Sequence, residues 1–213
     1  AVVVFAPDRE LTFSTFATAF GVPMTIILPI VAILSVTSEW SQRSGLTTFT
    51  LVPHRSRVIL AKAIAAVAMG VVSMLLALAI GALGNLVGTA ITGTPVVWNI
   101  AWVDVGSIIV GNVLGLLSGF MLGVLIRNSP GAISTYFGFS FLLPPVLGLL
   151  ATSQQWFRDA RPWVDISFAQ TPLFMFNGSI TGEQWANIAV TGVVWLAIPL
   201  VVGVRLVLRS EVK

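Results

Sequence analysis

Five long runs of apolar residues, separated by short polar segments, constrain this chain more than any other feature of its sequence. The runs cover residues 19–37, 63–91, 105–126, 133–151 and 184–208. A helix of about 20 apolar residues can cross the hydrocarbon core of a bilayer, and each run is close to that length or exceeds it. Only 9% of the 213 residues are charged, whereas a soluble domain has about 25%. The sequence therefore predicts an all-α polytopic membrane protein, with one transmembrane domain over residues 1–213.

Charge is distributed unevenly between the segments that connect these runs. If segment 38–62 is cytoplasmic, eight of the eleven Lys and Arg residues face the cytoplasm and six of the eight acids lie outside. This is the asymmetry described by the positive-inside rule. It predicts a multi-pass protein of the inner (plasma) membrane, with a cytoplasmic C-terminus and an extracellular segment 152–182. Five spans would leave Ala1 outside, so we expect a missing first span before it, which would give six.

The sequence contains few groups that could carry out catalysis. The centres of the predicted spans have no Asp, Glu, Lys, Arg or His, and His54 is the only histidine. One histidine cannot make an HExxH metalloprotease motif, and no GxxxxGK phosphate-binding loop is present. The chain has no cysteine and lacks the dense basic face that nucleic-acid binding requires. We predict a chain that is not an enzyme, with no metal, no cofactor of its own and no nucleic-acid partner.

Two sets of residues inside the runs suggest helix packing or a path for a substrate. The third run has a glycine at every fourth position, which predicts a face for close packing of another helix. These glycines are Gly111, Gly115, Gly119 and Gly123. The second set consists of polar residues within the runs, which either line a substrate path or hydrogen-bond between helices. They include Asn85, Asn112, Ser118 and Tyr136.

Segment 152–182 is polar and rich in aromatic residues, so it could form interfacial or re-entrant helices. At its end, Thr181 and Gln184 have the spacing of a capping box. This spacing predicts that the last helix starts near Gly182.

Segment 38–62, SEWSQRSGLTTFTLVPHRSRVILAK, is the only long polar interruption with clustered positive charge. Its apolar residues, such as Trp40 and Phe49, are interspersed with polar ones, which favours a short amphipathic helix at the membrane surface or against a partner. The order Glu39, Gly45-Leu-Thr-Thr-Phe-Thr-Leu51, Pro53-His-Arg-Ser-Arg57 and Lys62 resembles the cytoplasmic loop of ABC-2-type transporter permeases, particularly those of actinobacteria. The resemblance covers about 25 residues. The span count, the glycine-rich helix and the long loop before the last helix are consistent with it.

The resemblance implies an ABC-2, or type V exporter-like, fold in which this segment is a cytoplasmic coupling helix docked on a separate ATPase subunit. The residues implied in coupling are Glu39, Arg43, Thr47, Phe49, Leu51, Pro53, Arg55 and Arg57. The complete exporter would contain two ATPases, which hold ATP and Mg, and a second permease that we expect to be identical. It would export a hydrophobic or amphipathic substrate, such as a drug, lipid or glycan-like molecule, and could confer antibiotic resistance.

Two other classes of protein fit the same runs. A membrane anchor or assembly subunit that transports nothing would use segment 152–180 as its working surface. A secondary transporter acting alone is disfavoured, because such proteins usually carry an ionisable residue within a span.

Overall fold

A computed structural model describes residues 11–41, 55–175 and 179–209, and all regular structure in these ranges is helical. Five helical segments are long and apolar enough to cross a membrane. Three are single helices and two contain a π-helical turn. They are α2 (Phe13–Ser41), α4 (Arg55–Thr92), α5 (Trp102–Ile126), the segment α6 (Ser129–Phe137)–η2 (Gly138–Leu142)–α7 (Leu143–Ser153), and the segment α10 (Gly182–Gly192)–η4 (Val193–Ala197)–α11 (Ile198–Arg209).

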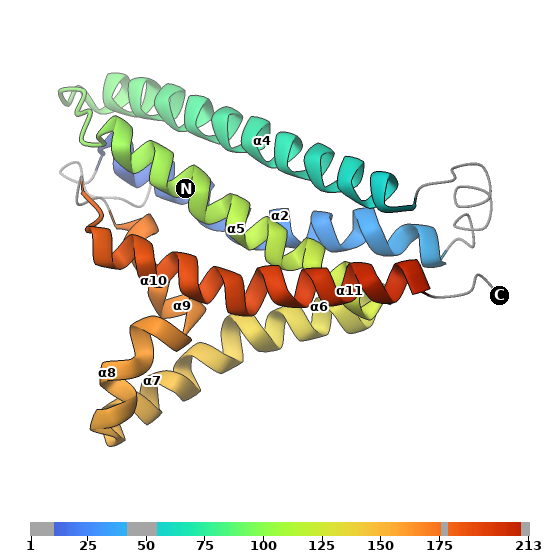
Figure 1. The fold of residues 1–213 in the computed structure, drawn as a ribbon. Coiled ribbons are helices and arrows are strands. Elements are labelled where there is room, and N and C mark those ends of the chain that lie inside the picture. The colour runs from blue at the N-terminus through green and yellow to red at the C-terminus, as the bar shows by residue number, and fades with distance from the viewer. Residues whose placement is uncertain (1–10, 42–54, 176–178, 210–213) are drawn as a thin grey trace.

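Helix α5 forms the centre of the bundle. It packs most extensively against α2 and also contacts α4, α6 and α11, and Figure 1 shows it between α4 and the α10–α11 segment. Half of its most apolar window is buried, against 22% for α4 and 6% for the α6–α7 segment. The main core cluster includes Leu28, Met74, Leu116 and Phe120. Because α4 and α7 bury little, most of their apolar surface is left outside the bundle.

This outward apolar surface is what a bilayer would cover. Leu83 and Ile91 on α4, and Leu142 and Leu149 on the fourth segment, are all more than half exposed. A soluble monomer rarely exposes contiguous apolar surface on this scale. Together with the five apolar helices, it indicates a membrane protein.

Charged residues gather at opposite ends of the bundle. One side of the bundle holds the C-terminal ends of α2, α5 and α11 and the N-terminal end of α4 (Figure 1). We call this side the basic end. The cationic residues at this end include Arg55, Arg57, Lys62, Arg127, Arg205 and Arg209. We call the opposite side the acidic end. It carries the acids Asp104, Asp159, Asp165 and Glu183 together with Arg158 and Arg161. The separation is compatible with the predicted orientation, which stays a prediction.

The helices extend past the apolar runs from which they were predicted. Helix α2 starts at Phe13 rather than residue 19, because the Phe13 ring packs against that of Trp98, tilted by 56° with centroids 5.1 Å apart, and Phe16 is buried. Helix α4 starts at Arg55 rather than residue 63. Near its start the Lys62 Nζ donates to the Ser35 carbonyl over 2.9 Å, which joins α4 to α2 at the basic end.

The expected start of the last span at Gly182 is confirmed. The Gln184 amide donates to Thr181 Oγ1 over 3.2 Å, and the Thr181 amide donates to Gln184 Oε1 over 2.9 Å. This reciprocal pair satisfies two amides that a helix N-terminus would otherwise leave without partners.

We predict that Thr181→Ala lowers the free energy of unfolding by about 1 kcal/mol, because it removes the N-cap oxygen. The matched control is Thr181→Ser, which keeps that oxygen and should stay close to the parent protein. Thermal unfolding of both variants in one detergent measures the difference. Equal melting temperatures for the Ala and Ser variants would show that the cap contributes nothing.

Candidate functional site: a polar cavity beside helix α5

A cavity of about 430 Å³ lies between α2, α5, the α6–η2 region and the short helices that precede the last span. This volume is in the range of small-molecule sites. Three of the four residues predicted for a substrate path, Asn112, Ser118 and Tyr136, line it. The cavity therefore brings together polar residues from two different spans, α5 and α6.

The glycine row of α5 divides between the cavity and the packing contact with α2. Gly111 and Gly115 line the cavity. A Cβ atom added at Gly119 would lie 2.8 Å from the backbone C and Cα of Pro29, and one at Gly123 would lie 3.2 Å from the Ile33 carbonyl oxygen. The second half of the row thus lets α2 approach closely, while the first half opens onto the cavity.

Asn112 is the most deeply buried polar residue of the cavity wall. Its side chain is 2% exposed, and its Nδ2 donates to the Ile108 carbonyl over 2.9 Å, one turn earlier in α5. Its Oδ1 has no hydrogen-bond partner among the described residues. A buried acceptor without a partner costs about 1–3 kcal/mol. The cavity therefore contains an acceptor that a bound molecule could satisfy.

The other hydroxyl groups of the inner wall are held by backbone carbonyls. The Tyr136 hydroxyl donates to the Thr25 carbonyl over 2.9 Å, and this bond links α6 to α2. The Ser118 hydroxyl donates to the Leu114 carbonyl over 2.9 Å, and the Thr25 hydroxyl donates to the Val22 carbonyl over 2.7 Å. These hydrogen bonds fix the orientation of the hydroxyl oxygens that line the cavity.

The outer wall of the cavity is made by the segment between the fourth and fifth spans, which folds back onto the bundle. It consists of α8 (Gln155–Val164), α9 (Ile166–Ala169) and the 3-10 helix η3 (Thr171–Phe174). The expectation of short helices in this segment is confirmed. Ile166, Ser167 and Phe174 of this segment line the cavity.

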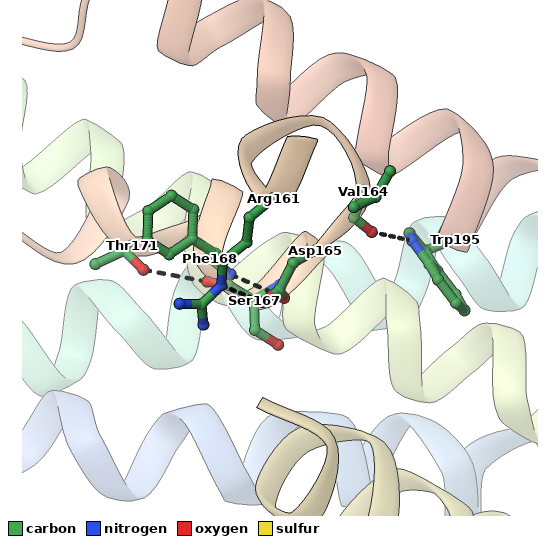
Figure 2. Close-up of polar contacts among 7 residues, drawn as sticks. All are labelled: Arg161, Val164, Asp165, Ser167, Phe168, Thr171 and Trp195. Carbon is green, nitrogen blue, oxygen red and sulfur yellow. Dashed lines mark hydrogen bonds and ion pairs between the residues drawn. The ribbon is translucent and has the colours of Figure 1, made fainter. Parts of the chain in front are cut away.

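Asp165 holds the turn between α8 and α9 (Figure 2). Its Oδ1 accepts from the amides of Ser167 and Phe168 over 3.0 and 3.1 Å, and its Oδ2 accepts from Arg161 Nε over 3.0 Å. The Arg161 guanidinium also lies over the Phe168 ring, 4.5 Å from its centroid. Asp165 is 2% exposed, so its charge is neutralised within the protein and α9 is fixed in place.

A second contact fixes the folded-back segment to the last span. Trp195 Nε1 donates to the Val164 carbonyl over 2.7 Å (Figure 2). Its ring also lies 5.6 Å from that of Phe139, which lines the cavity. Trp195 stands in the π-helical turn η4 and Phe139 in the π-helical turn η2. Turns of this kind are frequent at functional sites, and here both of them support the cavity wall.

Sequence reasoning did not select Arg161, Asp165 or Trp195. The available signal was the opposite charge of Arg161 and Asp165 at a spacing of four residues, in a chain with few charges. Nothing local in the sequence indicates that Trp195 reaches Val164, because the two residues are far apart along the chain.

The remaining predicted residues lie away from the cavity. Asn85 is fully buried on α4 and donates to the Val97 carbonyl over 3.2 Å, so it holds the loop after α4. Among the coupling residues, Glu39 belongs to the last turns of α2, Arg55 begins α4, and Arg57 is exposed near that start. The other coupling residues, Arg43, Thr47, Phe49, Leu51 and Pro53, lie outside the described residues.

The composition of the wall determines which ligands the cavity suits. None of the residues that line it is Asp, Glu, His, Cys, Lys or Arg, so it offers neither the usual metal ligands nor a charge. It can hold an organic molecule by apolar contact and hydrogen bonds. No family model matches the chain, and no curated protein or solved structure is found to be similar to it.

Proposed function

We propose that this chain is the membrane-spanning permease subunit of an ABC-2-type exporter, driven by a separate ATPase. The observation that carries the proposal is segment 38–62. Its sequence resembles the coupling loop of such permeases, and it connects the ends of α2 and α4 at the basic end (Figure 1). Two ATPase subunits, holding ATP and Mg, would dock there, and a second copy of this chain would complete the transporter.

Helix α2 connects the proposed docking segment to the cavity. It ends at Ser41, directly before the basic residues, and its Val22 and Thr25 line the cavity. Pro29, between these two regions, contacts Gly119 of α5. A displacement of the end of α2 by the ATPase would therefore change both the contact with α5 and the wall of the cavity. A ligand bound there can respond only if it interacts differently with the two arrangements.

The test is co-purification with the ATPase encoded beside this chain. We predict that the double variant Phe49→Asp, Arg55→Glu loses the ATPase, because it removes an apolar anchor and reverses a charge that would pair with acids of the partner. Each hot-spot residue of an interface contributes about 2 kcal/mol or more, so the affinity should fall by roughly 100-fold or more.

Arg209→Glu is the matched control, since it reverses a charge at the same basic end but on α11. It should retain the ATPase. If the double variant binds as well as the parent chain, or if no ATPase binds at all, segment 38–62 is only a basic topogenic loop.

Either of these two results would favour the alternative, a membrane anchor that transports nothing. That alternative needs segment 152–180 as a free working surface. Ile166, Ala169 and Leu173 of this segment are buried against the rest of the protein, so only part of the segment is available to a partner.

A further inference from the structure

We propose that the cavity beside α5 binds an uncharged amphipathic molecule that carries hydroxyl groups, which it recognises through the unpartnered oxygen of Asn112. That such a molecule is exported rests on the function proposed above, whereas its binding does not. The inference comes from the number of hydrogen-bond donors and acceptors that the wall leaves available.

The inner wall offers acceptors and few donors. Each hydroxyl group has one hydrogen and two lone pairs. The hydroxyl hydrogens of Thr25, Ser118 and Tyr136 are donated to backbone carbonyls, and Ser140 is hydrogen-bonded to Tyr136. What remains for a ligand on this wall is oxygen lone pairs.

Asn112 strengthens this bias toward acceptors. Its Nδ2 donates one of its two hydrogens to the Ile108 carbonyl, whereas its Oδ1 is buried and accepts no hydrogen bond from the described residues. Asn112 lies ten residues after Trp102, about 15 Å along α5 at 1.5 Å per residue, which is close to the middle of this 25-residue helix. A ligand donor that reaches this depth would satisfy the oxygen, whereas the hydroxyl hydrogens of Thr25, Ser118 and Tyr136 are already donated to backbone carbonyls.

The outer wall differs, because it can also donate. Thr171 donates its hydroxyl to the Ser167 carbonyl over 3.2 Å, but Ser167 and Gln170 have side-chain groups that can donate as well as accept. Both line the cavity. A hydroxylated ligand, which can donate to Asn112 and accept from this side, matches the two walls together.

The described residues that line the cavity carry no charge, which disfavours the binding of ions. An anion would find no cation among the described lining residues, and an ammonium group would find no carboxylate there. Moving either ion from water into such a site without a partner is strongly unfavourable. The rings of Phe139 and Phe174 and the side chains of Val22 and Ile166 complete the lining. They provide contacts for an apolar body attached to the hydroxyl group.

Three probes with the same apolar body test this inference. They are 2-naphthol, which donates a hydrogen bond, 2-methoxynaphthalene, which cannot, and 2-naphthoate, which is an anion. Binding is measured by equilibrium dialysis on the full chain in lipid nanodiscs, with empty nanodiscs subtracting partition into lipid. We expect 2-naphthol to bind roughly tenfold more tightly than either of the others, the effect of one buried hydrogen bond. Equal binding of the three probes, or preferred binding of 2-naphthoate, would overturn the inference.

Variants locate the site. Asn112→Leu keeps the number and branching of the side-chain heavy atoms but removes the acceptor, so it should abolish the preference for 2-naphthol over 2-methoxynaphthalene. Asn187→Leu is the matched control, because Asn187 is also buried with an unpartnered Oδ1 but does not line the cavity. It should keep the preference. Gly115→Val, which reduces the cavity and keeps the Asn112 amide, should weaken all three probes. If the preference is unchanged in Asn112→Leu and the affinities of all three probes are unchanged in Gly115→Val, the probes bind elsewhere and the proposal is contradicted.

The two proposals fail separately in these experiments. Loss of probe selectivity overturns the ligand class and leaves ATPase docking as it was. Failure to co-purify an ATPase overturns the exporter and leaves the dialysis result unaffected, because no ATPase is present in the nanodiscs.

Discussion

Gly119→Ala is expected to lower the free energy of unfolding by about 3 kcal/mol, the upper part of the range for overpacking a buried contact. The new Cβ atom would lie 2.8 Å from the C and Cα atoms of Pro29. These are backbone atoms, so no change of rotamer relieves the overlap. Pro29 is itself almost fully buried, and α2 would have to move away from α5 along their main contact.

Gly115→Ala is the control for this prediction. It changes the same face of the same helix four residues earlier, where the added Cβ would lie 3.8 Å from Pro29 Cγ, an ordinary contact. Alanine is favoured over glycine inside a helix by up to about 1 kcal/mol, so this variant should match the parent protein or exceed it slightly. Thermal unfolding followed by circular dichroism compares the two. Equal melting temperatures would mean that α2 and α5 do not pack through Gly119.

The difference between Gly115 and Gly119 could not be predicted from the sequence. Spacing alone predicted a row of four equivalent packing positions. In the structure, Phe174 of η3 stands beside Gly111, where a Cβ atom would lie 2.6 Å from its Cζ, whereas α2 stands beside Gly119. The residue that packs against Gly111 belongs to η3, some sixty residues later in the chain. The spacing of glycines within one helix does not indicate which segment will pack against each of them.

The positions of the spans could be predicted from the sequence because hydropathy is a local property. All five predicted runs fall within helices that the structure describes, and the capping box at Thr181 located one helix start. The extensions of α2 and α4 were missed because they depend on contacts such as Phe13 with Trp98. The π-helical turns η2 and η4 were missed for a related reason, since the rings of Phe139 and Trp195 that they carry meet only in the folded bundle.

The cavity was predicted only as a set of candidate residues. Asn112, Ser118 and Tyr136 stood out as polar residues in apolar runs, but their meeting depends on the bond from Tyr136 to the Thr25 carbonyl, which joins residues 111 positions apart. Asn85 stood out equally and lies elsewhere. Polarity within a span therefore identified residues with structural roles, but it could not distinguish residues that line the cavity from a residue that holds a loop.

Asp165→Ala should release the outer wall of the cavity and is the second large effect that we predict. The substitution leaves the amides of Ser167 and Phe168 without their acceptor and leaves Arg161 without its partner. Hydrogen bonds to a charged group contribute about 1.5–3 kcal/mol each, and removing one member of a largely buried ion pair costs about 3–5 kcal/mol. Because these contributions overlap, we expect the free energy of local unfolding of residues 155–174 to fall by about 4 kcal/mol in total.

Asp165→Asn separates the two roles of the carboxylate. The amide oxygen of asparagine can still cap α9, while the charge that pairs with Arg161 is lost. Amide hydrogen exchange of residues 155–174 should therefore increase in the order parent, Asn, Ala, with α4 and α5 unchanged. If the inner and outer walls act together on a ligand, the affinity for 2-naphthol should fall in the same order. Uniform exchange across the whole chain would mean that Asp165 supports the entire bundle, and unchanged exchange would mean that the Trp195–Val164 contact alone holds the segment.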